Sequence, residues 1–261
     1  MTARTTMEYH VPWFHPLTIT ILSIVTALAL VLRWVLLPPA RQRQDRTHAV
    51  ITGGSSGIGL ALAHECVKKG FTTVTLIARD STKLQNAQKE LQQRDDSKKC
   101  RIITYAINVS DAKACQETAN EIIRQGGPPT ILFNNAGTSS SAAFKDTNVE
   151  EFQHLITINY LGTVYLTQAL LPFMSGGGTM MVTSSMAGLV GVYGYTAYSA
   201  SKFALRGYCE ALQMEVRRDQ IRIIMAYPPD TDTPGYQLEN VTKPKETLAI
   251  SDAAGLFTPE A

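Results

Sequence analysis

The sequence predicts an α/β protein with a doubly wound parallel sheet and helices on both faces. From residue 47 onward, short apolar runs alternate with helical patterns, which is typical of right-handed βαβ units. A glycine-rich turn, Gly53 to Gly59, joins the first such run to the first helical pattern. Other polar motifs fall where later strands should end, and ligands bind at that edge of such sheets.

The expected elements follow in order from the hydrophobic patterns and the turn residues. A catalytic domain is expected over 47–235, and 236–261 is expected to be a truncated substrate-loop or tail region, because nothing after Gly235 resembles a seventh strand. The final strand and helices of such a fold are therefore expected to be missing. The predicted strands cover 48–52, 72–78, 101–107, 130–133, 179–183 and 221–226, and the predicted helices cover 60–69, 81–94, 112–124, 150–173 and 197–217.

The N-terminus has a different composition. After a tail over 1–16, residues 17–37 are mostly apolar and carry no charge except Arg33, and as a helix they would rise about 32 Å, enough for a bilayer core. A buried core helix and a signal peptide cleaved near Ala27–Ala29 are the alternatives. Arginines in the basic linker 38–46 outnumber those before the span, which predicts an anchor with the domain in the cytosol.

Composition excludes several classes of function. A hydrophobic fraction of 44% supports a folded core, and a net charge of +2 gives no reason to expect a nucleic-acid partner. The four cysteines are far apart and have no histidine at metal-ligand spacing, so free thiols and no metal site are expected.

The glycine loop predicts a dinucleotide site. Glycines there let the backbone approach a pyrophosphate at the N-terminus of the following helix. An acidic residue about 20 positions later would favour NAD, but Arg79 stands there and Lys83 follows. Cations at this position suit a 2′-phosphate, so NADP is the predicted cofactor, although both residues could be ordinary surface charges.

A tyrosine and a lysine four residues apart predict the catalytic chemistry. Tyr198 and Lys202 would share one face of a helix, where the ammonium would lower the pKa of the phenol. The tyrosine could then act as general acid toward a ketone. Ser185 follows a predicted strand and could hydrogen-bond the substrate oxygen.

Together these motifs resemble the short-chain dehydrogenase/reductase family, from about His48 to Gly235. The matching segments are Thr52–Gly59, Asn134–Gly137, Ser184–Ser185 and Tyr198–Lys202, with an asparagine at 159. The resemblance implies a Rossmann-type fold and a catalytic tetrad of Asn159, Ser185, Tyr198 and Lys202, with Ser184 as the alternative serine. The residues expected to bind NADP are Gly53, Ser55, Ser56, Gly57, Ile58, Gly59, Arg79, Lys83, Asn108, Val109, Asn135, Ala136, Gly137, Tyr198, Lys202, Pro228, Thr231 and Thr233.

A narrower resemblance joins the chain to the branch of this family that reduces 3-ketosphinganine. It is carried by residues 197–217, 226–235 and 242–247, where Pro228-Pro229 replaces the usual Pro-Gly. The resemblance implies an NADPH-dependent reductase of a long-chain 3-keto amine in sphingolipid synthesis, on the cytosolic face of the endoplasmic reticulum membrane. A homo-oligomer is a further expectation. A microsomal steroid or retinoid enzyme and an inactive scaffold are the alternatives.

Overall fold

The computed structural model describes residues 16–36, 47–93, 100–174 and 176–260. The chain divides into two compact units, Met1–Arg41 and Gln42–Ala261. The predicted tail, apart from Pro16, and the predicted basic linker lie outside the described residues.

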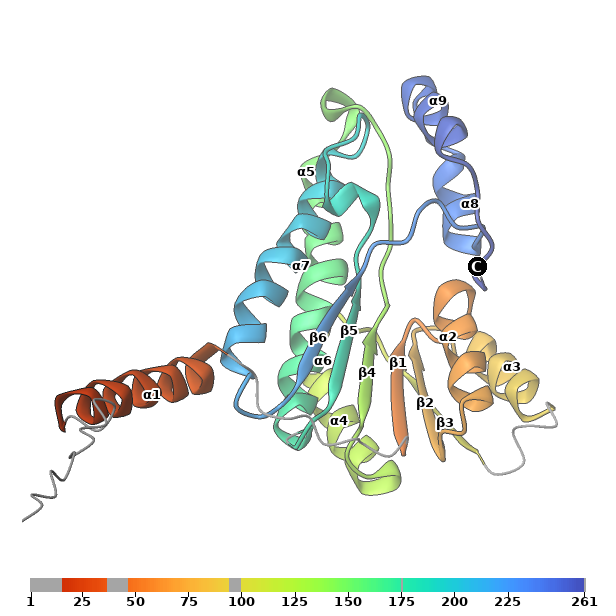
Figure 1. Cartoon of the computed structure of the whole chain (residues 1–261). Helices are drawn as coiled ribbons and strands as arrows, with labels where there is room; N and C mark the ends of the chain where they lie inside the picture. The colour runs from red at the N-terminus through yellow and green to blue at the C-terminus, as the bar shows by residue number, and fades with distance from the viewer. Residues whose placement is uncertain (1–15, 37–46, 94–99, 175, 261) are drawn as a thin grey trace, which may run out of the picture. The chain divides into compact units, whose positions relative to one another are not determined.

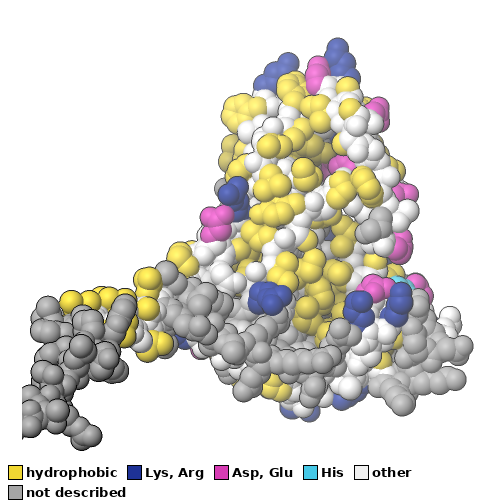
Figure 2. Space-filling view, in the orientation of Figure 1, with side chains coloured by type: hydrophobic (Ala, Val, Ile, Leu, Met, Phe, Trp, Pro, Cys, Tyr) yellow, Lys and Arg dark blue, Asp and Glu magenta, His cyan; other side chains and the backbone are white. Residues whose placement is uncertain are grey.

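The described part of the first unit is helix α1, Pro16–Leu36. Its described side chains, 19–32, are all exposed and mostly apolar (Figure 2). Within the described residues, no helix is both long and apolar enough to cross a bilayer. The helix predicted over 17–37 is therefore confirmed as a helix, whereas its role as a membrane span is not confirmed.

The second unit contains a six-stranded sheet in the order β3-β2-β1-β4-β5-β6 (Figure 1). Every neighbouring pair is parallel, which confirms the predicted doubly wound topology. Strand order reverses between β1 and β4, so the ends of these two strands form the switch point where such sheets bind ligands. The strands are β1 His48–Thr52, β2 Thr73–Ala78, β3 Arg101–Ala106, β4 Ile131–Asn134, β5 Thr179–Thr183 and β6 Arg222–Ala226.

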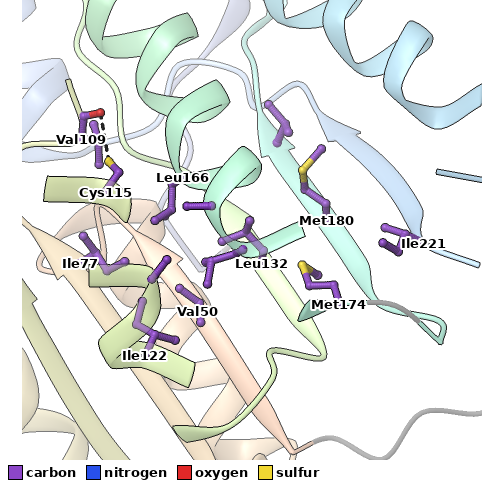
Figure 3. Close-up of a cluster of buried hydrophobic side chains, with 14 of the residues drawn as sticks. Val50, Ile77, Val109, Cys115, Ile122, Leu132, Leu166, Met174, Met180 and Ile221 are labelled. Carbon is purple, nitrogen blue, oxygen red and sulfur yellow. Dashed lines mark hydrogen bonds between the residues drawn. The ribbon is translucent and has the colours of Figure 1, made fainter. Parts of the chain in front are cut away.

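Helices cover both faces of the sheet, and alternate strand residues point to opposite sides. Ile51 of β1 packs with helices α2 and α3, whereas Val50 packs with Ile122, Leu132 and Leu166 on the opposite face (Figure 3). These two apolar layers hold the sheet between its helices. The helices of this core are α2 Gly57–Lys68, α3 Ser81–Gln92, α4 Ala112–Gly126, α6 Gly162–Leu170 and α7 Thr196–Glu215.

The single helix predicted over 150–173 is interrupted. Helix α5, Val149–Leu155, leads into a π-helical turn, Ile156–Leu161, before α6 begins, and a 3₁₀ turn at Leu171–Phe173 ends the segment. Gly162 lies so close to Val109 that an added Cβ would be 2.8 Å from Cγ2 of that valine. The π turn therefore ends where α6 meets the segment that follows β3, and such turns are frequent at functional sites.

The region predicted as a truncated substrate loop or tail contains two helices. Helix α8, Pro234–Asn240, begins before the predicted domain boundary at Gly235, and α9 covers Lys245–Ala254. The Thr233 hydroxyl caps α8 by accepting from the Tyr236 N–H. The predicted substrate-loop region thus contains helices, and no seventh strand is found in the described chain; an isolated bridge joins Thr231 to Phe257.

Candidate active site

The glycine loop between β1 and α2 has the geometry of a close-approach turn. Gly53 and Gly57 have φ angles of 65° and 54°, in the region that favours glycine. A Cβ on Gly59 would be 2.2 Å from the carbonyl oxygen of Gly53, so only glycine fits there. Helix α2 begins at Gly57 and presents its first N–H groups at this turn, as a pyrophosphate requires.

The Thr52 hydroxyl joins this loop to the end of β4. It accepts hydrogen bonds of 2.9 Å from the N–H groups of Asn135 and Ala136, and it donates to the carbonyl of Phe133. The loop after β4 is thereby held against Gly53. Sequence reasoning assigned Thr52 no role, because the bond links segments 83 and 84 residues apart.

A cavity of about 740 Å³ lies at this edge of the sheet. Every residue predicted to bind the cofactor lines it except Gly59, which lies beneath the loop. Arg79 follows β2 and Lys83 lies in the first turn of α3, both exposed. Asn108 is also exposed, and its side chain accepts from the Ser110 N–H. The predicted cofactor residues therefore converge on one space.

Tyr198 and Lys202 reach the same cavity from α7. Lys202 is buried, and its Nζ donates to the carbonyl of Thr183 at 3.0 Å. Burial lowers the pKa of Lys202 to about 8. Its Nζ lies 5.6 Å from the centre of the Tyr198 ring.

The two neighbouring serines have different surroundings. Both line the cavity, but Ser185 acts on the Tyr198 phenol, whose pKa it lowers, and its hydroxyl accepts from the Ala187 N–H. Ser184 is buried, and its hydroxyl donates to the carbonyl of Lys202 at 3.4 Å. The geometry therefore favours Ser185 as the serine that meets a substrate oxygen, while Ser184 supports the backbone of α7.

The pKa of Tyr198 differs from the sequence-based expectation. Burial raises it, the Ser185 hydrogen bond lowers it, and the charges of Glu239 and Asp230 raise it further. The expected lowering by a nearby ammonium is wrong here, because burial is the largest contribution and Lys202 is not among the groups that shift this pKa. A phenol that keeps its proton can still serve as a proton donor.

Asn159 lies in the π-helical turn and does not line the cavity. Its amide is fully engaged: Oδ1 accepts from the Thr138 N–H, and Nδ2 donates to the Thr138 carbonyl and to the Ser201 hydroxyl. The side chain thus ties the loop after β4 to α7. On this geometry Asn159 positions the site rather than touching a substrate.

A second polar cluster adjoins Tyr198, and sequence reasoning missed it. The Tyr195 hydroxyl donates to Glu239 of α8, which pairs with Lys243 at 3.1 Å. Lys243 also lies 3.8 Å from Asp230, and its side chain is fully buried. The four-residue spacing of Glu239 and Lys243 was the available signal, but their burial depends on contacts with a distant segment.

The sequence and the fold both resemble those of known proteins. The family model described as short chain dehydrogenase matches residues 47–243. A zebrafish (Danio rerio) 3-dehydrosphinganine reductase is 42% identical over 93% of this chain and 74% of its own length, and a cattle (Bos taurus) 3-ketodihydrosphingosine reductase is 45% identical over 82% and 65%. The structure of L-sorbose reductase from Gluconobacter frateurii, complexed with NADPH and L-sorbose, superposes with a TM-score of 0.73 at 27% identity, covering 82% of this chain and 85% of that one.

Proposed function

Because the chain belongs to the short-chain dehydrogenase family, we propose that it reduces the ketone of 3-ketosphinganine, a long-chain 3-keto amine, with NADPH. One observation carries the proposal: Ser185, Tyr198 and Lys202 line the same cavity as the glycine loop. The sphinganine-forming reductases of zebrafish and cattle, at 42% and 45% identity, support the choice of substrate. The chain spans 74% and 65% of the lengths of those two proteins, so its activity is proposed from the residues of its own site.

In the proposed reaction, Tyr198 gives its proton to the ketone oxygen. Ser185 lowers the pKa of the same phenol and would hold that oxygen in line with it. Lys202 is anchored by the Thr183 carbonyl, and its ammonium would stabilise the phenolate that forms. Ser201 and Thr138, held by Asn159, keep α7 and the loop after β4 in register for this transfer.

The residues of the loop fit a dinucleotide. The close approach of Gly59 to Gly53 leaves no room for a side chain, and the N-terminus of α2 suits a pyrophosphate. When bound, the reduced nicotinamide supplies the hydride. Arg79 and Lys83 would hold the ribose 2′-phosphate, which supports NADPH over NADH.

We also propose that the domain acts at the cytosolic face of the endoplasmic reticulum membrane. The apolar exposed side chains of α1 and the arginines that follow it in the sequence support this placement. A substrate with a long alkyl chain resides in a bilayer, which agrees with it. Protease added to intact microsomes should digest the domain; a protected domain would refute the orientation.

The test of the function is turnover by the full chain. In detergent micelles, 3-ketosphinganine should drive NADPH oxidation and yield sphinganine, whereas steroid and retinoid carbonyls should be poor substrates. Preferred turnover of a steroid or retinoid would replace the proposed substrate with one of those classes. No turnover of any carbonyl by a protein that binds NADPH would favour the scaffold alternative.

A further inference from the structure

The cavity has two halves, one around the glycine loop and the end of β2 and one around Tyr198, and different charged residues line each half. In the described structure they are Arg79, Asp80 and Lys83 near the end of β2, and Lys202, Asp230 and Glu239 near Tyr198. We propose that Asp230 determines substrate specificity by binding the ammonium group that lies next to the reacting ketone. This inference rests on the proposed function, because it assumes that the substrate is an amino ketone.

The charge of the cluster beside Tyr198 is not balanced. Within the described residues, Lys243 is the one cation paired with Asp230 or Glu239. Two carboxylates and one ammonium leave one negative charge. Glu239 holds the shorter ion pair, 3.1 Å against 3.8 Å, and also accepts from Tyr195, so the surplus charge lies on Asp230.

Burial decides which carboxylate a ligand can reach. The side chain of Lys243 is 0% exposed and that of Glu239 is 8% exposed, whereas that of Asp230 is 31% exposed and lines the cavity. Lys243 and Glu239 therefore form the supporting layer, and Asp230 presents its carboxylate to the cavity. A cationic group that enters would gain a charge-assisted contact, while a neutral group would leave the surplus charge unpaired.

The cluster lies close to the reacting position. The Tyr195 and Tyr198 rings are 5.5 Å apart, and the Tyr195 hydroxyl contacts Glu239. Both Asp230 and Glu239 raise the pKa of the Tyr198 phenol, so their charges act at that atom. Lys202, the other charged group at this end, is turned to the Thr183 carbonyl.

Apolar residues continue from this position to the protein surface. Leu238 of α8 and Ile250 of α9 line the cavity, yet they are 75% and 48% exposed. An alkyl chain could lie along them with its amine at Asp230. The combination of a ketone site, an anionic group and an apolar exit fits a long-chain amino ketone better than a sterol, which has no cationic group.

Equilibrium binding tests the inference without relying on turnover. The probes are sphinganine, a cationic amine, and N-acetylsphinganine, its neutral amide, presented to the full chain in neutral detergent micelles. Wild-type protein should bind the amine about tenfold more tightly than the amide. Asp230→Asn should abolish this preference, whereas Asp232→Asn should keep it, because Asp232 is exposed and does not line the cavity.

Each outcome separates the inference from the proposed function. Equal affinity for amine and amide in the wild-type protein overturns the role of Asp230, even if 3-ketosphinganine is reduced. A preference that persists in Asp230→Asn also overturns it. A preference that depends on Asp230, in a chain that reduces no ketone, supports the amine site and refutes the reductase.

Discussion

The two halves of the cavity are built in different ways. The half around the glycine loop depends on backbone geometry: positive φ angles at Gly53 and Gly57, and a glycine at position 59 that leaves no space for a side chain. The half beside Tyr198 depends on side chains from distant segments, such as the bond between Tyr195 and Glu239. The first half can be recognised from one local sequence motif, whereas the second is formed by residues that are far apart in the sequence.

This difference has a consequence for mutation. The half around the glycine loop should tolerate changes elsewhere in the cavity, because its shape is set by β1, α2 and the Thr52 hydroxyl. The buried ion pair of Glu239 with Lys243 should not tolerate loss of one partner, because a buried unpaired charge is costly. Substitutions in one half should therefore leave the other half intact.

Tyr198 offers the largest expected effect. Tyr198→Phe should lower the reduction rate about 10²- to 10⁴-fold, the usual scale for loss of a general acid, and leave NADPH affinity nearly unchanged. Single-turnover kinetics and NADPH titration measure the two quantities. Tyr193→Phe is the matched control, because Tyr193 is exposed and does not line the cavity. Near wild-type reduction by Tyr198→Phe would show that another group donates the proton.

The same contrast explains what the sequence could predict. Strands 48–52 and 179–183 were predicted at their observed bounds, and the cofactor residues converge as expected, because alternation and glycine spacing are local signals. The π-helical turn at 156–161 was not predicted, because no local sequence signal separates it from the continuous helix expected over 150–173.

Other features needed three-dimensional contacts. Neighbouring serines look equivalent in sequence, and only their surroundings separate Ser185 from Ser184. Helices α8 and α9 were missed because they are short, and the pairing of Lys243 with Glu239 of α8 and with Asp230 is seen only in the folded chain. The pKa of Tyr198 was mispredicted for the same reason, as burial is a property of the fold.

Lys243 offers the next largest effect. Lys243→Met should lower the stability of the α8–α9 region by about 3 kcal/mol, because it leaves the Glu239 carboxylate buried without its cation. Urea unfolding followed by circular dichroism, with hydrogen exchange at α8, measures the loss. NADPH affinity should change little if the two halves are independent.

Two variants sharpen this test. Lys245→Met removes an exposed lysine of α9 and should be nearly neutral. Combining Lys243→Met with Glu239→Gln removes the unpaired charge and should recover part of the stability. If Lys243→Met is as stable as the wild-type protein, the ion pair does not stabilise the half of the cavity beside Tyr198. The two halves would then not differ in their sensitivity to mutation.

Arg79 offers the smallest effect, and it tests the half of the cavity around the glycine loop. Arg79 is exposed, so solvent screens its charge, and a single contact to a 2′-phosphate should add only modestly to the binding affinity. Arg79→Asp should therefore lower the ratio of NADPH to NADH use about tenfold, through lost attraction and added repulsion of the phosphate. Lys89→Asp makes the same charge change on α3 away from the cavity and should leave the ratio unaltered. The stability of α8 should be unaffected in both variants. An unchanged ratio in Arg79→Asp would remove the basis for NADP preference. Equal effects of the two variants would indicate a long-range effect of the charge change rather than a contact with the phosphate.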